Sequence, residues 1–205
     1  MISQRRRDRM EAVVTRRLAR VRCAVEAVHH RHNVSAILRT CDSLGIHHVH
    51  LVGTQHLKVS PGAARGAERW LALHHHADAD EAIAELRRGG FRIYVADLEA
   101  DPLPPEAVPV DAPVCLWFGA EAVGVSQRAR AAADGVVTLP MHGFAQSLNV
   151  SVAAALALRP VAEAARGLGQ AALLSPDERD RTLSHWIERE HALRAGIALR
   201  SGGSP

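Results

Sequence analysis

A cluster of polar side chains precedes a run of small apolar residues in LPMHGFAQSLNVSVAAALAL, residues 139–158. The cluster consists of Gln146, Ser147 and Asn149, which follow a glycine-containing turn. The apolar run predicts a buried helix beginning near residue 147. Ser147 has two explanations here, because serine commonly caps a helix N-terminus and a polar cluster at a helix entrance also suits a ligand site.

Two further polar motifs follow predicted strands. Asn33 and Arg39 come after the first strand, and Gly119 and Glu121 come after the apolar strand VCLWF. In an open parallel α/β sheet, ligands bind at the carboxyl ends of the strands. We therefore expect the three motifs to converge on one site.

Each of these residues also has a purely structural explanation. Asn33 either caps the following helix or fixes Arg39. Arg39 either serves the site or pairs with Asp42, three residues further along the same helix. Glu121 either serves the site or binds a helix N-terminus through its carboxylate.

Common phosphate-binding and hydrolytic motifs are absent from the sequence. It contains no GxGxxG fingerprint, no P-loop around its single lysine, Lys58, and no GxSxG nucleophile elbow. A bound cofactor must therefore be held by loops of another design.

Neither the cysteines nor the histidines have a metal-binding spacing. Cys23, Cys41 and Cys115 lie far apart with no CxxC pair, which suits a reducing compartment and small core side chains. The histidine runs at 47–50 and 74–76 lack the ligand spacing of a zinc site. We expect no metal, and histidines that are solvated or at a strand edge.

Strand and helix signals alternate along the chain, which predicts an α/β fold: a mostly parallel sheet with helices on both faces. The expected strands are 21–28, 47–53, 70–73, 91–98, 114–119 and 135–139. Helices are expected around 8–21, at 34–44 before Gly45, at 78–88 and 126–133, and from about 147. Pro160 should break or kink that last helix unless it begins a new one. A final helix should start with Ser175 as N-cap and Pro176 at the first position, with Leu183, Trp186 and Ile187 on its apolar face.

We divide the chain into a basic helical N-terminal extension (1–20), an α/β domain (21–160) and a helical C-terminal extension (161–205). Hydrophobic residues make up 47% of the 205 residues and charged residues 23%, as in soluble globular proteins. No apolar run reaches the roughly 18–20 residues of a membrane span. The N-terminus has no apolar segment like that of a secretory signal, so a cytoplasmic protein is expected.

The N-terminus is strongly basic. Residues 1–22 contain eight arginines against only Asp8 and Glu11. This segment is either an arm that seeks phosphate groups or a solvated amphipathic helix. The guanidinium fork of arginine suits phosphate better than a lysine would.

Three stretches of the sequence together resemble one known family. NVSAILRTCDSLGI (33–46), LWFGAEAVGVS (116–126) and LPMHGFAQSLNVSVAAA (139–155) are similar to the three motifs of the SPOUT superfamily, in particular the TrmH-type RNA ribose 2′-O-methyltransferases. The resemblance implies a deep C-terminal trefoil knot that holds S-adenosylmethionine in a bent conformation, no metal, and a homodimer formed through the knot region. The two extensions are similar to those of tRNA (guanosine-18) methyltransferases.

The resemblance also implies roles for individual residues. Arg39 matches the proposed activator of the ribose hydroxyl, which reaches the cofactor pocket from the partner subunit. Ala96 stands where relatives often carry threonine, and Arg31 stands where many carry proline, so Arg31 adds a phosphate contact. The expected catalytic residues are Arg39, Asn33, Glu121, Ser147 and Asn149. The expected cofactor-binding residues are Ala96, Gly119, Leu139, Met141, Ser147 and Leu148. The expected RNA-binding residues are Arg5, Arg6, Arg7, Arg9, Arg16, Arg17, Arg20 and Arg31.

The function implied is S-adenosylmethionine-dependent 2′-O-methylation of a ribose in RNA, at guanosine 18 in the D-loop of tRNA. The alternatives within this class are ribosomal RNA (23S) and the tRNA wobble nucleotide. A noncatalytic RNA-binding module and a flavodoxin-like nucleotide-binding protein are alternatives from other classes. Arg39 acts either as a transient base or as a charged clamp on phosphate, and we favour the clamp because a guanidinium has a pKa above about 12.

Overall fold

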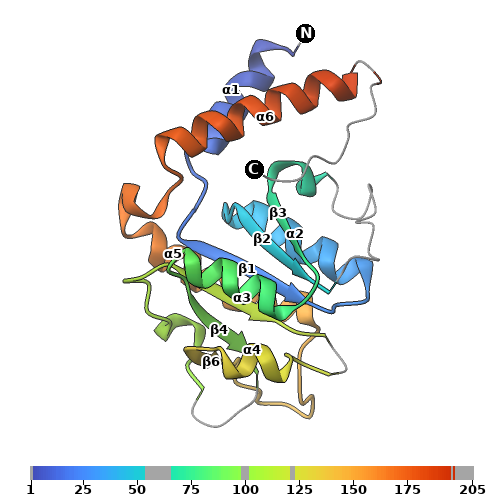
Figure 1. Cartoon of the computed structure of the whole chain (residues 1–205), viewed down its shortest axis with the longest axis vertical. Coiled ribbons are helices and arrows are strands. Elements are labelled where there is room, and N and C mark those ends of the chain that lie inside the picture. The colour runs from blue at the N-terminus through green and yellow to red at the C-terminus, as the bar shows by residue number, and fades with distance from the viewer. Residues whose placement is uncertain (1, 54–65, 98–101, 121–122, 195, 197–205) are drawn as a thin grey trace.

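A six-stranded parallel sheet forms the centre of the molecule (Figure 1). The computed structural model describes residues 2–53, 66–97, 102–120, 123–194 and 196. The strand order is β3-β2-β1-β5-β4-β6, and every pairing is parallel. The strands are β1 (Val21–Glu26), β2 (His48–Val52), β3 (Ala72–His76), β4 (Arg92–Ala96), β5 (Val114–Phe118) and β6 (Gly135–Val137). The predicted parallel α/β sheet is confirmed.

Helices cover both faces of the sheet. They are α1 (Gln4–Val14), α2 (Arg31–Leu44), α3 (Ala79–Arg88), α4 (Gln127–Ala131), α5 (Val150–Arg166) and α6 (Pro176–Arg194), with short 3-10 turns at η1 (Ala67–Trp70), η2 (Pro105–Ala107) and η3 (Gly169–Ala172). Helices α2 and α5 bury one face of the sheet around residues such as Ile37 and Leu158. Helices α3 and α4 bury the other face around Leu86 and Trp117.

The central strand β1 shows why this sheet must be covered on both sides. Its side chains alternate between the two cores, with Cys23 and Val25 on the α2–α5 side and Ala24 on the α3–α4 side. Strands buried on both faces are typical of parallel sheets. Cys23, Cys41 and Cys115 are buried free thiols, which agrees with their expected role as small core side chains.

Helix α2 begins earlier than expected, so the prediction that Asn33 caps it is wrong. The N-cap is His30, whose carbonyl accepts hydrogen bonds from the backbone N–H groups of Asn33 and Val34. Asn33 therefore lies in the first helical turn. The predicted stop at Gly45 is confirmed, because Gly45 has a left-handed φ of 75°, which glycine adopts without steric cost.

Helix α5 differs from the prediction at two places. Its N-cap is Asn149, whose side-chain oxygen accepts a hydrogen bond from the Ser151 N–H at 2.9 Å, so Ser147 is not the cap. The helix also continues through Pro160, although a proline lacks the N–H of a regular helical bond. The neighbours Leu158, Val161 and others on this face are buried in the core, which holds the helix together across the missing bond.

The two terminal helices pack against each other, away from the main cores. Figure 1 shows α1 and α6 crossing side by side at one end of the molecule. The start of α6 is confirmed, since Ser175 and Glu178 exchange hydrogen bonds between side chain and backbone in both directions. A small apolar cluster joins the helices through Met10, Val14 and Trp186. No helix in the described ranges has the length and apolar character to cross a membrane.

Arg17 is structural, so its predicted contact with RNA is wrong. Its side chain is only 1% exposed, bonds the Asp42 carboxylate at 2.5 Å and lies over the Trp186 ring. The alternative pairing of Arg39 with Asp42 is also wrong, because Asp42 is bound by Arg17. Arg20 is half-buried and donates to the backbone carbonyls of Val110 and Asp111.

The histidine runs are more buried than the sequence suggests. His50 on β2 is fully buried, and His47 and His76 are each 5% exposed. The run 74–76 does lie on an edge strand, since β3 ends the sheet. The expectation of solvated or strand-edge side chains is therefore wrong for His47 and His50, which pack under α6 and α3, and it holds for His76 on the edge strand.

Replacing His47 with glutamine should make folding stability less sensitive to acid. Burial, and secondarily the charge of Arg17, lowers the pKa of His47 from 6.5 to about 3. The unfolded chain therefore binds a proton that the folded chain excludes, and stability falls as the pH drops below 6.5. When the pH falls from about 7.5 to about 5.5, this group should lower the free energy of unfolding of the wild type by about 1.4 kcal/mol. The His47→Gln variant should not lose this contribution.

Urea unfolding of both proteins at the two pH values measures this difference. His29 is exposed, so a His29→Gln variant is the control and should lose as much stability as the wild type. Equal losses in wild type and His47→Gln would contradict the assignment of a buried neutral imidazole.

Candidate functional site

A cavity of about 480 Å³ opens at the carboxyl ends of β4, β5 and β6. The loops that follow these strands form its walls, together with the first turns of α5. The volume lies within the range of about 300–1,000 Å³ that small-molecule sites occupy. The lining residues are Ala96, Asp97, Phe118, Gly119, Ala120, Gly124, Val137, Thr138, Leu139, Met141, Gln146, Ser147, Leu148, Asn149, Val150, Ala153 and Ala157. The site therefore lies where an open parallel sheet should carry it.

The structure brings together the residues expected to bind a cofactor. All six of them line this one cavity: Ala96, Gly119, Leu139, Met141, Ser147 and Leu148. Asn149, expected to be catalytic, also lines it. Glu121 lies outside the described residues.

Gly119 is a position where the cavity wall has no room for a side chain. A Cβ atom there would lie 2.1 Å from the carbonyl oxygen of Gly124 and 2.4 Å from the backbone nitrogen of Val125. Gly124 itself has a φ of 68°. Gly119 therefore packs directly against the backbone of Gly124 and Val125, and only glycine at position 119 allows this approach.

A buried carboxylate that the sequence analysis missed anchors this loop. Glu26 ends β1 and is 8% exposed. Its side-chain oxygen accepts hydrogen bonds from the Trp117 indole N–H at 2.9 Å and from the Ser126 backbone N–H at 3.1 Å. The signal in the sequence was an acidic residue at the end of an otherwise apolar strand, VRCAVE.

Asp97 is a second lining residue that the sequence analysis missed. It follows β4 directly, as expected for a site residue, and forms an ion pair with Arg130 of α4 at 2.7 Å. This pair links the loop after β4 to the helix after the Gly119 loop. It therefore holds two walls of the cavity together.

Two asparagines connect the first and third polar motifs. The Asn149 side-chain N–H donates to the Asn33 side-chain oxygen at 3.2 Å. The other end of the Asn149 amide accepts from the Ser151 N–H and hydroxyl, at 2.9 and 2.6 Å. Since both ends of the amide are bonded, its orientation at the cavity edge is fixed, and α2 is tied to the start of α5.

Arg39 lies apart from the cavity of its own chain. It is exposed on α2 and does not belong to the lining. Its guanidinium has no hydrogen bond or ion pair with any described residue. The structure thus joins Asn33 to the third motif but leaves the Arg39 side chain directed to the surface.

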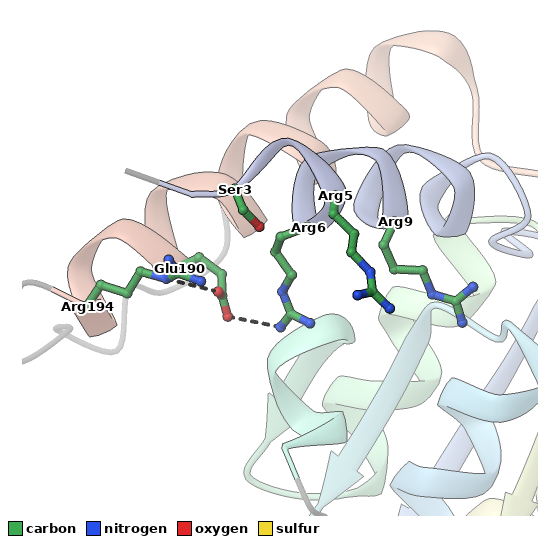
Figure 2. A pocket seen from close by; sticks show the side chains of 6 residues that line it. All are labelled: Ser3, Arg5, Arg6, Arg9, Glu190 and Arg194. Atoms are coloured by element: carbon green, nitrogen blue, oxygen red, sulfur yellow. Dashed lines mark hydrogen bonds and ion pairs between the residues drawn. The ribbon is translucent and has the colours of Figure 1, made fainter.

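A basic hollow of about 740 Å³ lies on the terminal helices (Figure 2). Figure 2 shows Arg5, Arg6 and Arg9 extending from α1 toward the same side. Arg6 pairs with Glu190 of α6 at 3.1 Å and lies over the Trp70 ring. Ser3 and Arg194 complete the lining. The other five arginines expected to bind RNA all lie outside this lining: Arg7, Arg16, Arg17, Arg20 and Arg31.

The chemistry available in the cavity is that of binding and positioning. Apolar side chains such as Leu139, Met141 and Leu148 form one part of the wall, and Asp97 and Asn149 supply polar groups. Such a wall fits a ligand that combines a flat apolar ring with polar or charged ends. Among the described lining residues no cysteine is available as a nucleophile.

Comparison with known proteins gives consistent matches over most of the chain. The profile of the SpoU rRNA Methylase family matches residues 20–159. The tRNA (guanosine(18)-2′-O)-methyltransferase of Thermus thermophilus is 38% identical over 193 residues, which cover 91% of this chain and 98% of that protein. The crystal structure of the A. aeolicus TrmH/SpoU tRNA modifying enzyme has a TM-score of 0.82 at 28% identity, covering 91% of this chain and 97% of that one. The SpoU methyltransferase AviRb from Streptomyces viridochromogenes, solved with AdoMet, has a TM-score of 0.63 at 25% identity, covering 73% of this chain and 61% of that one.

Proposed function

Because this chain belongs to the SpoU rRNA methylase family, we propose that it methylates the ribose 2′-oxygen of guanosine 18 in the D-loop of tRNA, with S-adenosylmethionine as the methyl donor. The observation that carries the proposal is the single cavity lined by all six residues expected to bind the cofactor. The match to a tRNA (guanosine(18)-2′-O)-methyltransferase over 91% of the chain supports the substrate.

The residues of the cavity fit S-adenosylmethionine. The apolar side chains of Leu139, Met141 and Leu148 hold the adenine, and the close approach at Gly119 leaves backbone groups free to bond it. Bound there, the cofactor would supply a methyl group to the ribose 2′-oxygen: the bond from the methyl carbon to sulfur breaks to leave S-adenosylhomocysteine, and the hydroxyl proton is released to solvent. Asn149, fixed by Asn33 and Ser151, orients the ribose at the cavity edge.

The backbone around this cavity is proposed to form a deep trefoil knot. The segment 138–149 and the loop after Gly119 share the cavity wall, as threading of one past the other requires. The catalytic domain is proposed to span 21–160, flanked by the two extensions. Their helices α1 and α6 form a unit around Trp186 that presents the basic hollow.

The basic hollow is proposed to hold tRNA phosphates. Four arginines, Arg5, Arg6, Arg9 and Arg194, surround it against one carboxylate, Glu190. Arginine forks bind phosphate oxygens bidentately, and this contribution to binding is independent of RNA sequence. Arg7, Arg16 and Arg31 lie outside the hollow and are proposed as further phosphate contacts.

The active unit is proposed to be a homodimer formed through the knot region and α5. Val152 and Leu156 lie one turn apart on α5 and are 46% and 51% exposed, which leaves an apolar strip on that helix. Arg39 lies outside the cavity of its own chain. A partner chain that covers the strip brings its own Arg39 to the cavity, so each site needs both chains.

Mixing two inactive variants should restore methyl transfer if sites are shared. An Arg39→Ala chain keeps an intact cavity, and an Asn149→Ala chain keeps its Arg39, so a heterodimer contains one complete site. With random pairing, about one site in four should be active. The measurement is methyl transfer by co-refolded chains, with each variant alone as control. A verified heterodimer without activity would show that each site is built within one chain.

Transfer of labelled methyl groups tests the reaction class. The protein is incubated with tritiated S-adenosylmethionine and unmodified tRNA transcripts, and the product is digested to nucleosides. A labelled 2′-O-methylnucleoside supports the proposal. Binding of the cofactor without transfer to tRNA or 23S rRNA would favour a noncatalytic RNA-binding module, and no binding would contradict the proposed cavity.

A further inference from the structure

Four histidines line one side of the sheet, beneath α3. His48 and His50 alternate along β2, and His74 and His76 alternate along β3, so all four point to the same face. The rings of His74 and His76 both stack on that of His50, with centroids 4.5 and 5.1 Å from it. Neither the methyl-transfer site nor the basic hollow includes any of them.

Three of these groups are arranged as metal ligands. One ligand atom each from His50, His76 and Glu85 of α3 lies within 4.8 Å of the others. His50 Nδ1 and His76 Nε2 are 2.9 Å apart, and Glu85 Oε2 is 3.9 Å from His76 Nε2. An ion among these three atoms needs only small movements to reach normal bond lengths of about 2.0–2.2 Å.

A second contact orients the carboxylate. His74 Nδ1 lies 2.9 Å from the other oxygen of Glu85, and His74 Nε2 lies 2.9 Å from His48 Nδ1. Metal-binding carboxylates are typically hydrogen-bonded in this way on the oxygen that does not bind the ion. The chain from His48 through His74 therefore keeps Glu85 turned toward His50 and His76.

We propose that His50, His76 and Glu85 form a binding site for a divalent transition metal of the zinc class. Two imidazoles and one carboxylate suit Zn²⁺, which takes four ligands and here completes its set with a water molecule. The two strands and the helix that supply the ligands are already held in place by the sheet and its core.

The protonation state of the site is compatible with a cation. His50 and His76 share one hydrogen bond, and the Arg22 guanidinium, which can only donate, lies 3.3 Å from His50 Nε2, so His50 carries its proton on Nδ1. The hydrogen bond between them holds one proton, which must leave His50 Nδ1 when the metal binds. The proton moves to His50 Nε2. The Arg22 guanidinium, whose Nη1 lies 3.3 Å from that nitrogen in the metal-free structure, then turns toward Glu85 Oε1, which is 3.8 Å away.

The site lies away from the proposed chemistry. Strand β3 is at one edge of the sheet, whereas β4, β5 and β6 carry the methyl-transfer cavity. A metal there fastens the edge strand to β2 and α3 and takes no part in methyl transfer. Its effect should appear in stability and not in catalytic rate.

Titration of tag-free, chelator-treated protein with Zn²⁺ tests the proposal. Calorimetry should show one equivalent bound per chain, and the midpoint of thermal unfolding should rise with Zn²⁺ concentration. His76→Ala and Glu85→Gln should each weaken binding at least about 100-fold, since each removes one of three ligands. His75 is exposed and alternates to the other face, so His75→Ala is the matched control and should bind Zn²⁺ like the wild type.

Several results would overturn the site. One is the absence of stoichiometric Zn²⁺ binding, and another is equal Zn²⁺ affinity in wild type and Glu85→Gln. Loss of Zn²⁺ binding in His75→Ala would also overturn it, because that result indicates adventitious binding by exposed histidines. Glu85→Gln keeps the size of the side chain, so it remains informative if His76→Ala fails to fold. Methyl transfer measured on the same variants shows whether the fold is intact.

Discussion

Replacing Arg39 with alanine lowers methyl transfer to RNA by about 100- to 1,000-fold and leaves S-adenosylmethionine affinity within about twofold. The loss is large because the guanidinium stabilises the charge that develops on the ribose oxygen and clamps a neighbouring phosphate. Cofactor affinity is kept because Arg39 is proposed to meet the RNA, whereas the residues expected to bind the cofactor all line the cavity and are unchanged in this variant. Single-turnover methyl transfer and calorimetry with the cofactor measure the two quantities separately.

Arg39→Lys distinguishes bidentate binding of a phosphate from the effect of a positive charge alone. Lysine keeps the positive charge but lacks the planar fork, so most of the loss should remain. An exposed arginine on the opposite face of the sheet, Arg88 of α3, provides the control, and Arg88→Ala should have wild-type activity. Near-full activity in Arg39→Lys would argue against a bidentate clamp, and full activity in Arg39→Ala would remove Arg39 from the mechanism.

Replacing Gly119 with alanine weakens S-adenosylmethionine binding by up to about 100-fold, because overpacking of this size costs up to about 3 kcal/mol. The added methyl group would lie 2.1 Å from the Gly124 oxygen and 2.2 Å from its carbonyl carbon. Both are backbone atoms, so the clash cannot be relieved by rotation of a side chain. The backbone near Gly124 must move instead. Calorimetric titration with the cofactor measures the loss, which methyl transfer should follow.

Gly143 offers a matched control for this substitution. It belongs to the loop that precedes the polar cluster, and a Cβ there would have no atom within 4 Å. Gly143→Ala should therefore bind the cofactor within about twofold of the wild type. Wild-type affinity in Gly119→Ala, with an unchanged thermal unfolding midpoint, would contradict the assignment of this cavity as the cofactor site.

The position of the site could be predicted from the sequence because parallel strands align their carboxyl ends. Ala96, Gly119 and Leu139 each come at or just after the end of a separate strand, and the sheet order places those strands side by side. The end of each strand can be recognised from a few neighbouring residues. The positions of these three residues depend mainly on where the strands end. The positions of Gly45 and Ser175 at helix ends were predictable for the same reason.

What the sequence did not predict depends on contacts between distant residues. Arg17 resembles its basic neighbours along the chain, yet Trp186 and Asp42 bury it. His50 and His76 belong to runs that look solvated, and only the pairing of β2 with β3 under α3 shows that they are stacked. The cap of α5 is Asn149 instead of Ser147 because the helix begins at Val150, about three residues later than expected, which local preference could not decide.

Mapping the methylated nucleotide is the decisive test of whether this protein modifies guanosine 18 of tRNA. An unmodified tRNA transcript is incubated with the protein and S-adenosylmethionine, and the methyl group is mapped by mass spectrometry of nuclease fragments. We expect one 2′-O-methylguanosine, at position 18, and no methylation of a transcript in which guanosine 18 is substituted. A methyl group on a base, at the wobble ribose, or on no tRNA nucleotide would contradict it.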